Sequence, residues 1–110
     1  MGKSIDENID DRGDLTHHSF VEFDWDDGKH ASNLEKHRVD FIDVIPAFAD
    51  VGKMIARDDR KDYGERRYNM LAMLEGRVFH ITFTPRGPVT WLISARKAND
   101  REQKRYEQRT

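Results

Sequence analysis

The sequence lacks cysteine altogether, and its 110 residues contain no long apolar run. Without cysteine there can be neither disulfide bonds nor cysteine-ligated zinc, so packing alone must hold the fold together. A membrane-spanning helix needs ~20 consecutive apolar residues, and the N-terminus has no apolar segment of the kind that directs export. We therefore expect a cytoplasmic protein whose length corresponds to one domain.

Net charge is also small, but the charges are distributed unevenly along the chain. The formal net charge at pH 7 is −2. Residues 1–27 contain two basic and nine acidic residues, whereas residues 28–110 contain seventeen basic and twelve acidic residues. The basic balance of the longer part suits a polyanion such as nucleic acid. The alternative is an ordinary charged surface, because an excess of this size is common in soluble domains.

The first 19 residues are polar, acidic and without apolar periodicity. Such a segment cannot bury enough apolar surface to offset the entropy lost on ordering. We therefore expect residues 1–19 to form a disordered acidic extension and residues 20–110 to form a single domain. His17 and His18 lie in the extension without further ligands nearby, so we expect neither a metal site nor a cofactor.

Four segments of alternating apolar residues predict β-strands. They cover residues 20–25, 66–74, 77–84 and 89–95. Short turns, at Glu75–Gly76 and at residues 85–88, join the last three strands and predict an antiparallel meander. The inner face of this meander is expected to contain Phe79, Ile81, Phe83, Trp91 and Ile93.

Helical spacing of apolar residues predicts two helices after the first strand. One covers residues 28–37, with Ala31 and Leu34 facing the core, and the other begins near Asp40 or Pro46. A third helix follows the predicted N-cap Asn99. The expected fold is α+β. It is a small two-layer domain with an antiparallel sheet, made of the N-terminal strand plus the three-stranded meander, two helices after the first strand and a C-terminal helix.

The C-terminal segment, residues 89–109, places cations at the end of a buried strand. Arg96 and Lys97 end the strand, and the helix that follows contains Arg101. Asn99 and Glu102 have the spacing of a capping box, which would hold the start of this helix. Cations held rigidly in this way are suited to binding phosphate, although they are equally typical of a solvated strand end.

A second group of polar residues recurs on one face of the predicted helix at residues 28–37. Lys29, Asn33, Lys36 and His37 have the i, i+4, i+7 and i+8 spacing of a single stripe. This stripe could contact a phosphate backbone without displacing a core residue. The alternative is a solvated face, which periodicity alone favours.

Three blocks of residues occur in a fixed order along the chain. The first contains Phe23, Trp25, Asp26, Lys29, Asn33, Lys36, His37, Val39 and Phe41. The second contains Asp59, Arg60, Tyr63, Gly64, Glu65 and Arg67. The third contains Thr84, Arg86, Gly87, Ile93, Ser94, Ala95, Arg96, Lys97, Ala98, Tyr106 and Glu107. Through these blocks, residues 20–108 resemble the BrnT toxin family of bacterial type II toxin–antitoxin systems.

The resemblance implies a RelE-like fold and a metal-independent endoribonuclease that inhibits translation. It also implies a cognate BrnA-like ribbon-helix-helix antitoxin, a toxin–antitoxin heterotetramer, and binding of operator DNA through the antitoxin. The chain departs from the family at three positions: Arg38 stands where glycine is usual, Pro85 where glutamate is frequent, and Pro46 is atypical.

Metal-free cleavage of RNA requires a proton acceptor for the ribose 2′-hydroxyl, stabilisation of the charge on the phosphorane, and a proton for the leaving oxygen. Arg86 and Arg96 are the candidates for charge stabilisation, although they lie at opposite ends of one strand and need not converge. His37 and Lys36 are the candidates for proton transfer, and His80, on the polar side of its strand, is a further one. Predicted RNA contacts are Lys29, Asn33, Lys97 and Arg101.

The alternative function is a non-catalytic module that binds nucleic acid or the antitoxin. The sequence has cations but no sharply defined acid–base pair, and for this reason the alternative remains open. In either case we expect the antitoxin to cover Lys29, Asn33, Lys36 and the sheet edge near Arg96, because an inhibitor often occupies the cations used on RNA.

Overall fold

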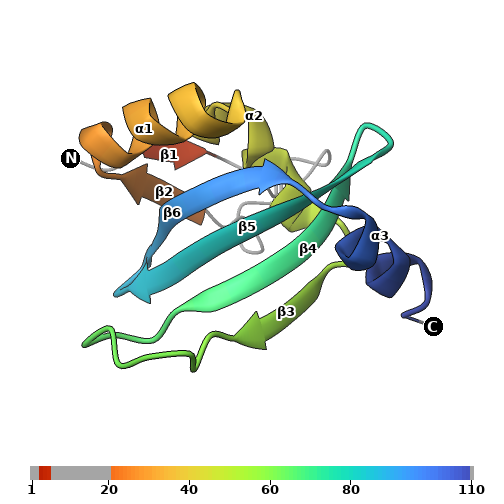
Figure 1. Ribbon diagram of the computed structural model, residues 1–110. Helices are drawn as coiled ribbons and strands as arrows, with labels where there is room; N and C mark the ends of the chain where they lie inside the picture. The colour runs from red at the N-terminus through yellow and green to blue at the C-terminus, as the bar shows by residue number, and fades with distance from the viewer. Residues whose placement is uncertain (1–2, 6–20, 110) are drawn as a thin grey trace, which may run out of the picture.

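The computed structural model describes residues 3–5 and 21–109, which form one six-stranded sheet, three α-helices and a 3₁₀ helix (Figure 1). In chain order the elements are β1 (Lys3–Ile5), β2 (Val21–Trp25), α1 (Asp27–His37), α2 (Phe41–Val44), the 3₁₀ helix η2 (Ile45–Ala49), β3 (Met54–Arg57), β4 (Tyr68–Leu74), β5 (Arg77–Arg86), β6 (Val89–Lys97) and α3 (Asp100–Glu107). None of the helices in this part of the chain is long and apolar enough to cross a membrane.

The strand order across the sheet is β1-β2-β6-β5-β4-β3. The predicted α+β class and the meander β4-β5-β6 are confirmed, because both hairpins pair antiparallel. The expectation of a wholly antiparallel sheet is wrong at one place, where β2 pairs parallel with β6 and Phe23 lies opposite Thr90. After β2 the chain passes through the helices and the rest of the sheet, and returns beside β2 in the same direction.

Two strands lie where none was expected. β3 covers Met54–Arg57, outside the four segments from which strands were predicted. β1 pairs antiparallel with β2 and belongs to the extension predicted to be disordered. The other residues of that extension, including His17 and His18, lie outside the described residues, as does Phe20.

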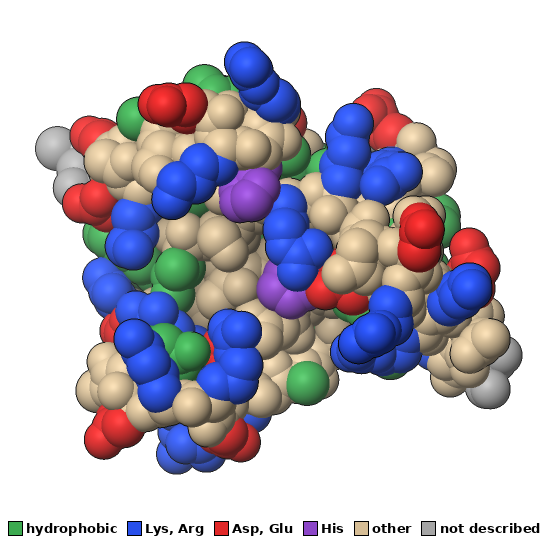
Figure 2. Space-filling view, in the orientation of Figure 1, with side chains coloured by type: hydrophobic (Ala, Val, Ile, Leu, Met, Phe, Trp, Pro, Cys, Tyr) green, Lys and Arg blue, Asp and Glu red, His purple; other side chains and the backbone are tan. Residues whose placement is uncertain are grey.

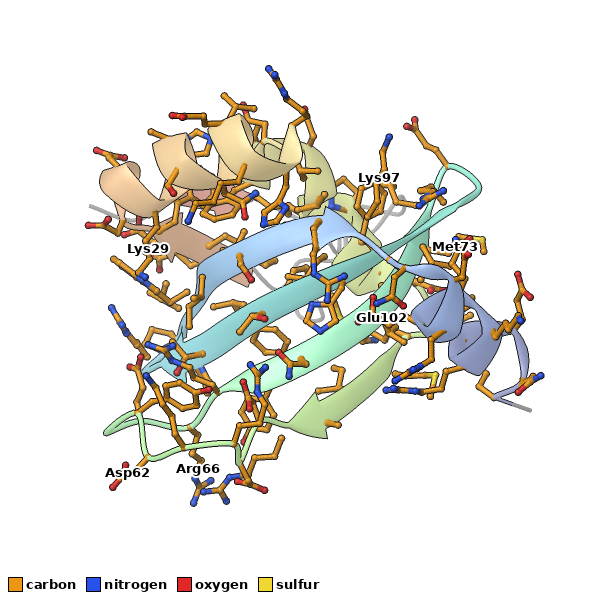
Figure 3. All side chains as sticks on the ribbon, viewed as in Figure 1. Lys29, Asp62, Arg66, Met73, Lys97 and Glu102 are labelled. Carbon is orange, nitrogen blue, oxygen red and sulfur yellow. The ribbon has the colours of Figure 1, made fainter. Side chains whose placement is uncertain are left out.

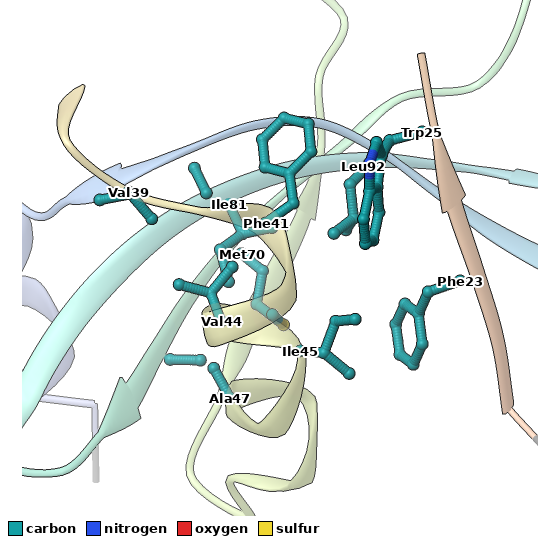
Figure 4. Close-up of a cluster of buried hydrophobic side chains, with 12 residues drawn as sticks. Phe23, Trp25, Val39, Phe41, Val44, Ile45, Ala47, Met70, Ile81 and Leu92 are labelled. Carbon is teal, nitrogen blue, oxygen red and sulfur yellow. The ribbon is translucent and has the colours of Figure 1, made fainter. Parts of the chain in front are cut away.

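The core lies between one face of the sheet and the segment that contains Val39, α2 and η2 (Figure 4). Its fully buried side chains include Phe23, Phe41, Val44, Ile45, Met70, Ile81 and Leu92. Ile81 was predicted to be in the core, but Trp91 was wrongly placed there. β6 contains one extra residue, Ile93, where the register shifts opposite Thr82 and Phe83, so Leu92 and Ala95 point into the core instead.

The other face of the sheet, which we call the open face, has no helix layer across it within residues 21–109. Of the described helices, α3 lies at one end of this face, beside the ends of β3, β4 and β5 (Figure 1). A small apolar cluster of Leu71, Val78, Ala98 and Tyr106 holds α3 in place. The hydroxyl of Tyr106 also donates a 2.6 Å hydrogen bond to the Asp50 carboxylate. Among the described residues, the open face therefore carries a firmly attached helix at its margin and no helix across its middle.

Helix α1 begins as expected, because the carboxylate of Asp26 accepts a hydrogen bond from the Lys29 backbone N–H at 2.9 Å. Its buried side is different from the predicted one. Ala31 and Leu34 are exposed, Leu34 by 43%, whereas Asn33 is buried. The prediction failed because a polar residue, rather than an apolar one, forms the contact between this helix and the sheet.

Helix α1 ends at Arg38, where the resemblance would favour glycine. Arg38 adopts the left-handed conformation itself, with φ 59° and ψ 29°, and its backbone N–H donates to the Leu34 carbonyl. The helix therefore ends with the backbone geometry that glycine supports, but with a side chain that makes this geometry costly.

We expect Arg38→Gly to raise the free energy of unfolding by about 1 kcal/mol, because glycine adopts positive φ without strain. Urea denaturation of the purified protein would measure the change. The matched control is Ser32→Gly within α1, which should instead lower stability by about 0.5 kcal/mol. Equal destabilisation by both substitutions would contradict the strain at Arg38.

Candidate functional site

Three ionisable side chains meet on the open face near its α3 end. β5 and β6 place His80 directly opposite Arg96. Glu102 reaches from α3 toward them (Figure 3) and forms a two-pronged ion pair with Arg96, with N–O distances of 2.8 and 2.9 Å. The His80 Nε2 atom lies 4.0 Å from the second carboxylate oxygen of Glu102. We refer to these residues as the His80–Arg96–Glu102 cluster.

The start of α3 holds Glu102 in this position. Asn99 and Glu102 form the predicted capping box, in which Glu102 N–H donates to Asn99 Oδ1 at 2.8 Å and Asn99 N–H donates to Glu102 Oε1 at 3.0 Å. The oxygen that accepts from Asn99 also accepts from Arg96. The helix start and the orientation of the Arg96 guanidinium are therefore coupled through one carboxylate.

The cluster keeps a neutral histidine beside a fixed cation. The ion pair with Arg96 lowers the pKa of Glu102 to about 2, and the hydrogen bond to Glu102 raises the pKa of Arg96. Burial lowers the pKa of His80, and the charge of Arg96 lowers it further. The His80 Nδ1 atom is buried without a hydrogen-bond partner in the described chain, whereas the Arg96 side chain is 33% exposed. A neutral imidazole can accept a proton, and an accessible guanidinium beside it can stabilise negative charge.

The predicted site residue Arg86 lies at the opposite end of the open face from this cluster. Arg86 pairs with Val89 at the start of β6. Val89 lies seven residues before Arg96 on the same strand, a separation of about 23 Å. Glu65 binds Arg86 with N–O distances of 3.1 and 3.2 Å, and the guanidinium lies 4.4 Å from the centre of the Trp91 ring. The structure therefore does not bring Arg86 and Arg96 together.

The stripe predicted on α1 divides into two parts. Lys29, Lys36 and His37 are exposed and line a pocket of about 210 Å³ beside Ser94 of β6. Asn33 belongs to the interior instead: its amide NH₂ donates to the carbonyls of Val39 and Ala95, and its oxygen accepts from Ala95 N–H. Both amide donors of Asn33 are used by the backbone, so the structure does not support a contact of this group with RNA.

The two remaining predicted RNA contacts differ in position. Lys97 pairs with Phe79 and lines a pocket on the core side of the sheet with Arg38 and Asp43, away from the open face. Arg101 is exposed on α3, one residue before Glu102. In the orientation of Figure 2, a basic side chain lies between the two histidine side chains of the face in view, and an acidic side chain adjoins the lower one.

The match to a known family covers the cluster and the elements that build it. A family model described as the ribonuclease toxin BrnT of type II toxin–antitoxin systems matches residues 25–102. This chain belongs to the BrnT family. The matched segment runs from Trp25, the last residue of β2, to the start of α3, and so includes His80, Arg96 and Glu102. No similar protein is found among curated proteins.

As a BrnT protein, the chain is a ribonuclease toxin, and the family implies an RNA target and an antitoxin partner. The non-catalytic alternative is not favoured. The position of Arg96 at the end of a strand, together with the resemblance, predicted Arg96, and strand alternation placed His80 on the polar side of β5. Sequence reasoning recognised the capping role of Glu102 but missed its ion pair with Arg96. It also named Glu65 in the second block but missed its contact with Arg86.

Proposed function

We propose that this BrnT protein cleaves RNA on the open face without a metal ion, using Arg96 and His80 as the reacting groups. The observation that carries the proposal is the pairing of a largely buried histidine with Arg96, whose guanidinium is oriented by Glu102. This pair supplies both a proton acceptor and a cation for phosphate from directly opposed positions on neighbouring strands. No other described residues of the predicted set are arranged in this way.

The chemistry follows from the two groups. His80 takes the proton of the ribose 2′-hydroxyl, and the 2′-oxygen attacks the adjacent phosphorus. Arg96 stabilises the negative charge that develops on the phosphorane, and the bond from phosphorus to the 5′-oxygen breaks. A water molecule protonates the leaving oxygen, and the proton held on His80 restores that water. The products are a 2′,3′-cyclic phosphate and a 5′-hydroxyl.

The exposed residues of α1 have a second role in this proposal. Lys36 and His37 line a pocket beside β6 that is separate from the His80–Arg96–Glu102 cluster. RNA that crosses the sheet from α1 to α3 would pass both places. We therefore assign Lys29, Lys36 and His37 to the phosphates that flank the cleaved bond, and Arg101 to a more distant phosphate on the α3 side.

The proposed partner is a BrnA-like ribbon-helix-helix antitoxin that forms a heterotetramer with the toxin and binds operator DNA. In this proposal the pair acts in the cytoplasm, and the free toxin inhibits translation by cleaving RNA. The cations at Arg96 and Lys36 give an acidic segment of the antitoxin a surface to cover. If the complex leaves both side chains exposed, this assignment is wrong.

The test is induced expression of the wild type and of Arg96→Ala, with growth and RNA integrity followed in the same cultures. We expect growth arrest and RNA degradation with the wild type only, because removal of one charge-stabilising group costs ~100-fold to 1,000-fold in rate. The matched control is Lys53→Ala, which removes an exposed cation outside the cluster and should remain toxic. A soluble, folded wild type that neither arrests growth nor degrades RNA would favour the binding alternative.

A further inference from the structure

A pocket of about 300 Å³ lies on the open face directly beside the His80–Arg96–Glu102 cluster. Its lining comes from β3, β4, β5, α3 and the segment after β3. The lining residues are Met54, Ile55, Ala56, Arg60, Asn69, Leu71, His80, Glu102 and Arg105. Because His80 and Glu102 belong to both the cluster and the pocket, a group bound in the pocket would adjoin the cleaved phosphate.

The pocket combines an apolar surface with a small number of polar groups. Leu71 is buried in the small cluster beneath α3, and Met54 packs against that cluster. A flat ring can lie against these side chains, and the methionine sulfur adds a favourable contact with an aromatic edge. The volume is at the lower end of the ~300–1,000 Å³ range of small-molecule pockets, which suits one nucleobase.

Asn69 provides an oriented hydrogen-bond donor in this pocket. The hydroxyl of Thr82, its cross-strand partner, donates to Asn69 Oδ1 at 2.8 Å. This bond fixes the orientation of the amide, and its NH₂ group has no hydrogen-bond partner within residues 21–109. The amide therefore presents donors to whatever occupies the pocket.

Two further side chains of the pocket are donors, whereas His80 is the proton acceptor of the proposed reaction. Arg60 and Arg105 are exposed at its margin. Glu102 is the one carboxylate among the lining residues, and Arg96 and the Asn99 N–H already occupy it. The side chains therefore offer donors to a base edge and no free carboxylate acceptor for an exocyclic amino group.

We propose that this pocket binds a guanine base next to the cleaved phosphate and that Asn69 determines the preference. Guanine presents two acceptors, O6 and N7, on one edge, whereas adenine and cytosine present an amino group there. Unpaired RNA bases are recognised through such edges, together with contact on the ring faces. The inference rests on the proposed function for its position beside the cleaved bond, but base binding can be measured without cleavage.

The first experiment titrates ¹⁵N-labelled wild type with guanosine 3′-monophosphate and with adenosine 3′-monophosphate, and follows the Asn69 side-chain amide by NMR. We expect the guanine nucleotide to shift this signal and to bind ~10-fold more tightly than the adenine nucleotide. Asn69→Asp replaces the donor with an acceptor while the Thr82 hydroxyl can still donate, and should remove the preference. Gln108→Glu adds the same charge at the exposed end of α3 and should preserve it.

The second experiment maps cleavage positions by the same three proteins on one RNA of defined sequence. We expect cleavage next to guanine in the wild type and in the Gln108→Glu control, and dispersed positions in Asn69→Asp. An Asn69 amide that does not respond, equal affinity for the two nucleotides, or an unchanged cleavage map in Asn69→Asp overturns the inference. Selective guanine binding by a wild type that cleaves no RNA would contradict the proposed function while supporting the base pocket.

Discussion

Replacing His80 with alanine is expected to lower the rate of RNA cleavage ~100-fold to 10,000-fold, the range of a lost proton-transfer group. His80 pairs with Arg96 across the strands, and its Nδ1 atom is buried without a partner in the described part of the chain. Purified wild type and variant would be compared by initial rates on a short RNA. Circular dichroism and the midpoint of thermal unfolding would show whether the variant is folded.

The pH dependence separates a proton-transfer role from a structural one. Burial, and then the charge of Arg96, lower the pKa of His80 from its ordinary value of 6.5. A base must be neutral to act, so the decline of kcat/KM on the acidic side should have its midpoint below pH 6.5. His80→Ala should lose this limb, and added imidazole should restore part of the rate. A variant that retains both the rate and the acidic limb would show that His80 is not the base.

Replacing Asn33 with alanine should lower the free energy of unfolding by about 3 kcal/mol, because it leaves buried polar groups unpaired. Asn33 is only 5% exposed. Its side chain joins α1 to β6 through two hydrogen bonds with the Ala95 backbone, and it also donates to the Val39 carbonyl. Without the amide, two carbonyl groups and one N–H lose their partners. Urea denaturation with a common slope for both proteins would measure the difference.

Leu34→Ala provides the control on the same helix. Leu34 is the neighbouring residue and an apolar one, but 43% of it is exposed, so its truncation should change stability by ~0.5 kcal/mol or less. We therefore expect Asn33→Ala to lower the free energy of unfolding more than Leu34→Ala does. Helical periodicity predicts the opposite order. Larger destabilisation by Leu34→Ala than by Asn33→Ala would restore the original assignment of the buried side.

The predicted positions of the strands and helices were largely right where local chemistry decides. Glu75 and Gly76 both adopt positive φ in the first hairpin turn, and Asp26 and Asn99 cap their helices through side-chain oxygens. These features depend on neighbours within a few residues, which the sequence displays. The added strands and the parallel pairing of β2 with β6 depend on segments far apart in the chain, so they could not be read in the same way.

The candidate site shows the same division between local and distant determinants. Period-two alternation was sufficient to place His80 on the polar side of β5, and the position of Arg96 at a strand end, together with the resemblance to a family, indicated Arg96. Their pairing required the register of β5 with β6, which shifts by one residue at Ile93. The same register puts Lys97 on the other face, away from the cluster. A one-residue shift in a strand moves its side chains to the opposite face. No local sequence pattern predicted the shift at Ile93.

The sequence by itself determined a small α+β domain, its main turns and caps, and its family, because these depend on local chemistry and on residue order. Tertiary structure alone decided which charged and polar side chains are available. Glu102 pairs with Arg96 because α3 packs beside the sheet. Asn33 is buried because its amide binds the backbone of β6. Burial and ion pairing depend on every neighbour in space, and for these residues the deciding neighbours lie on other elements of the fold.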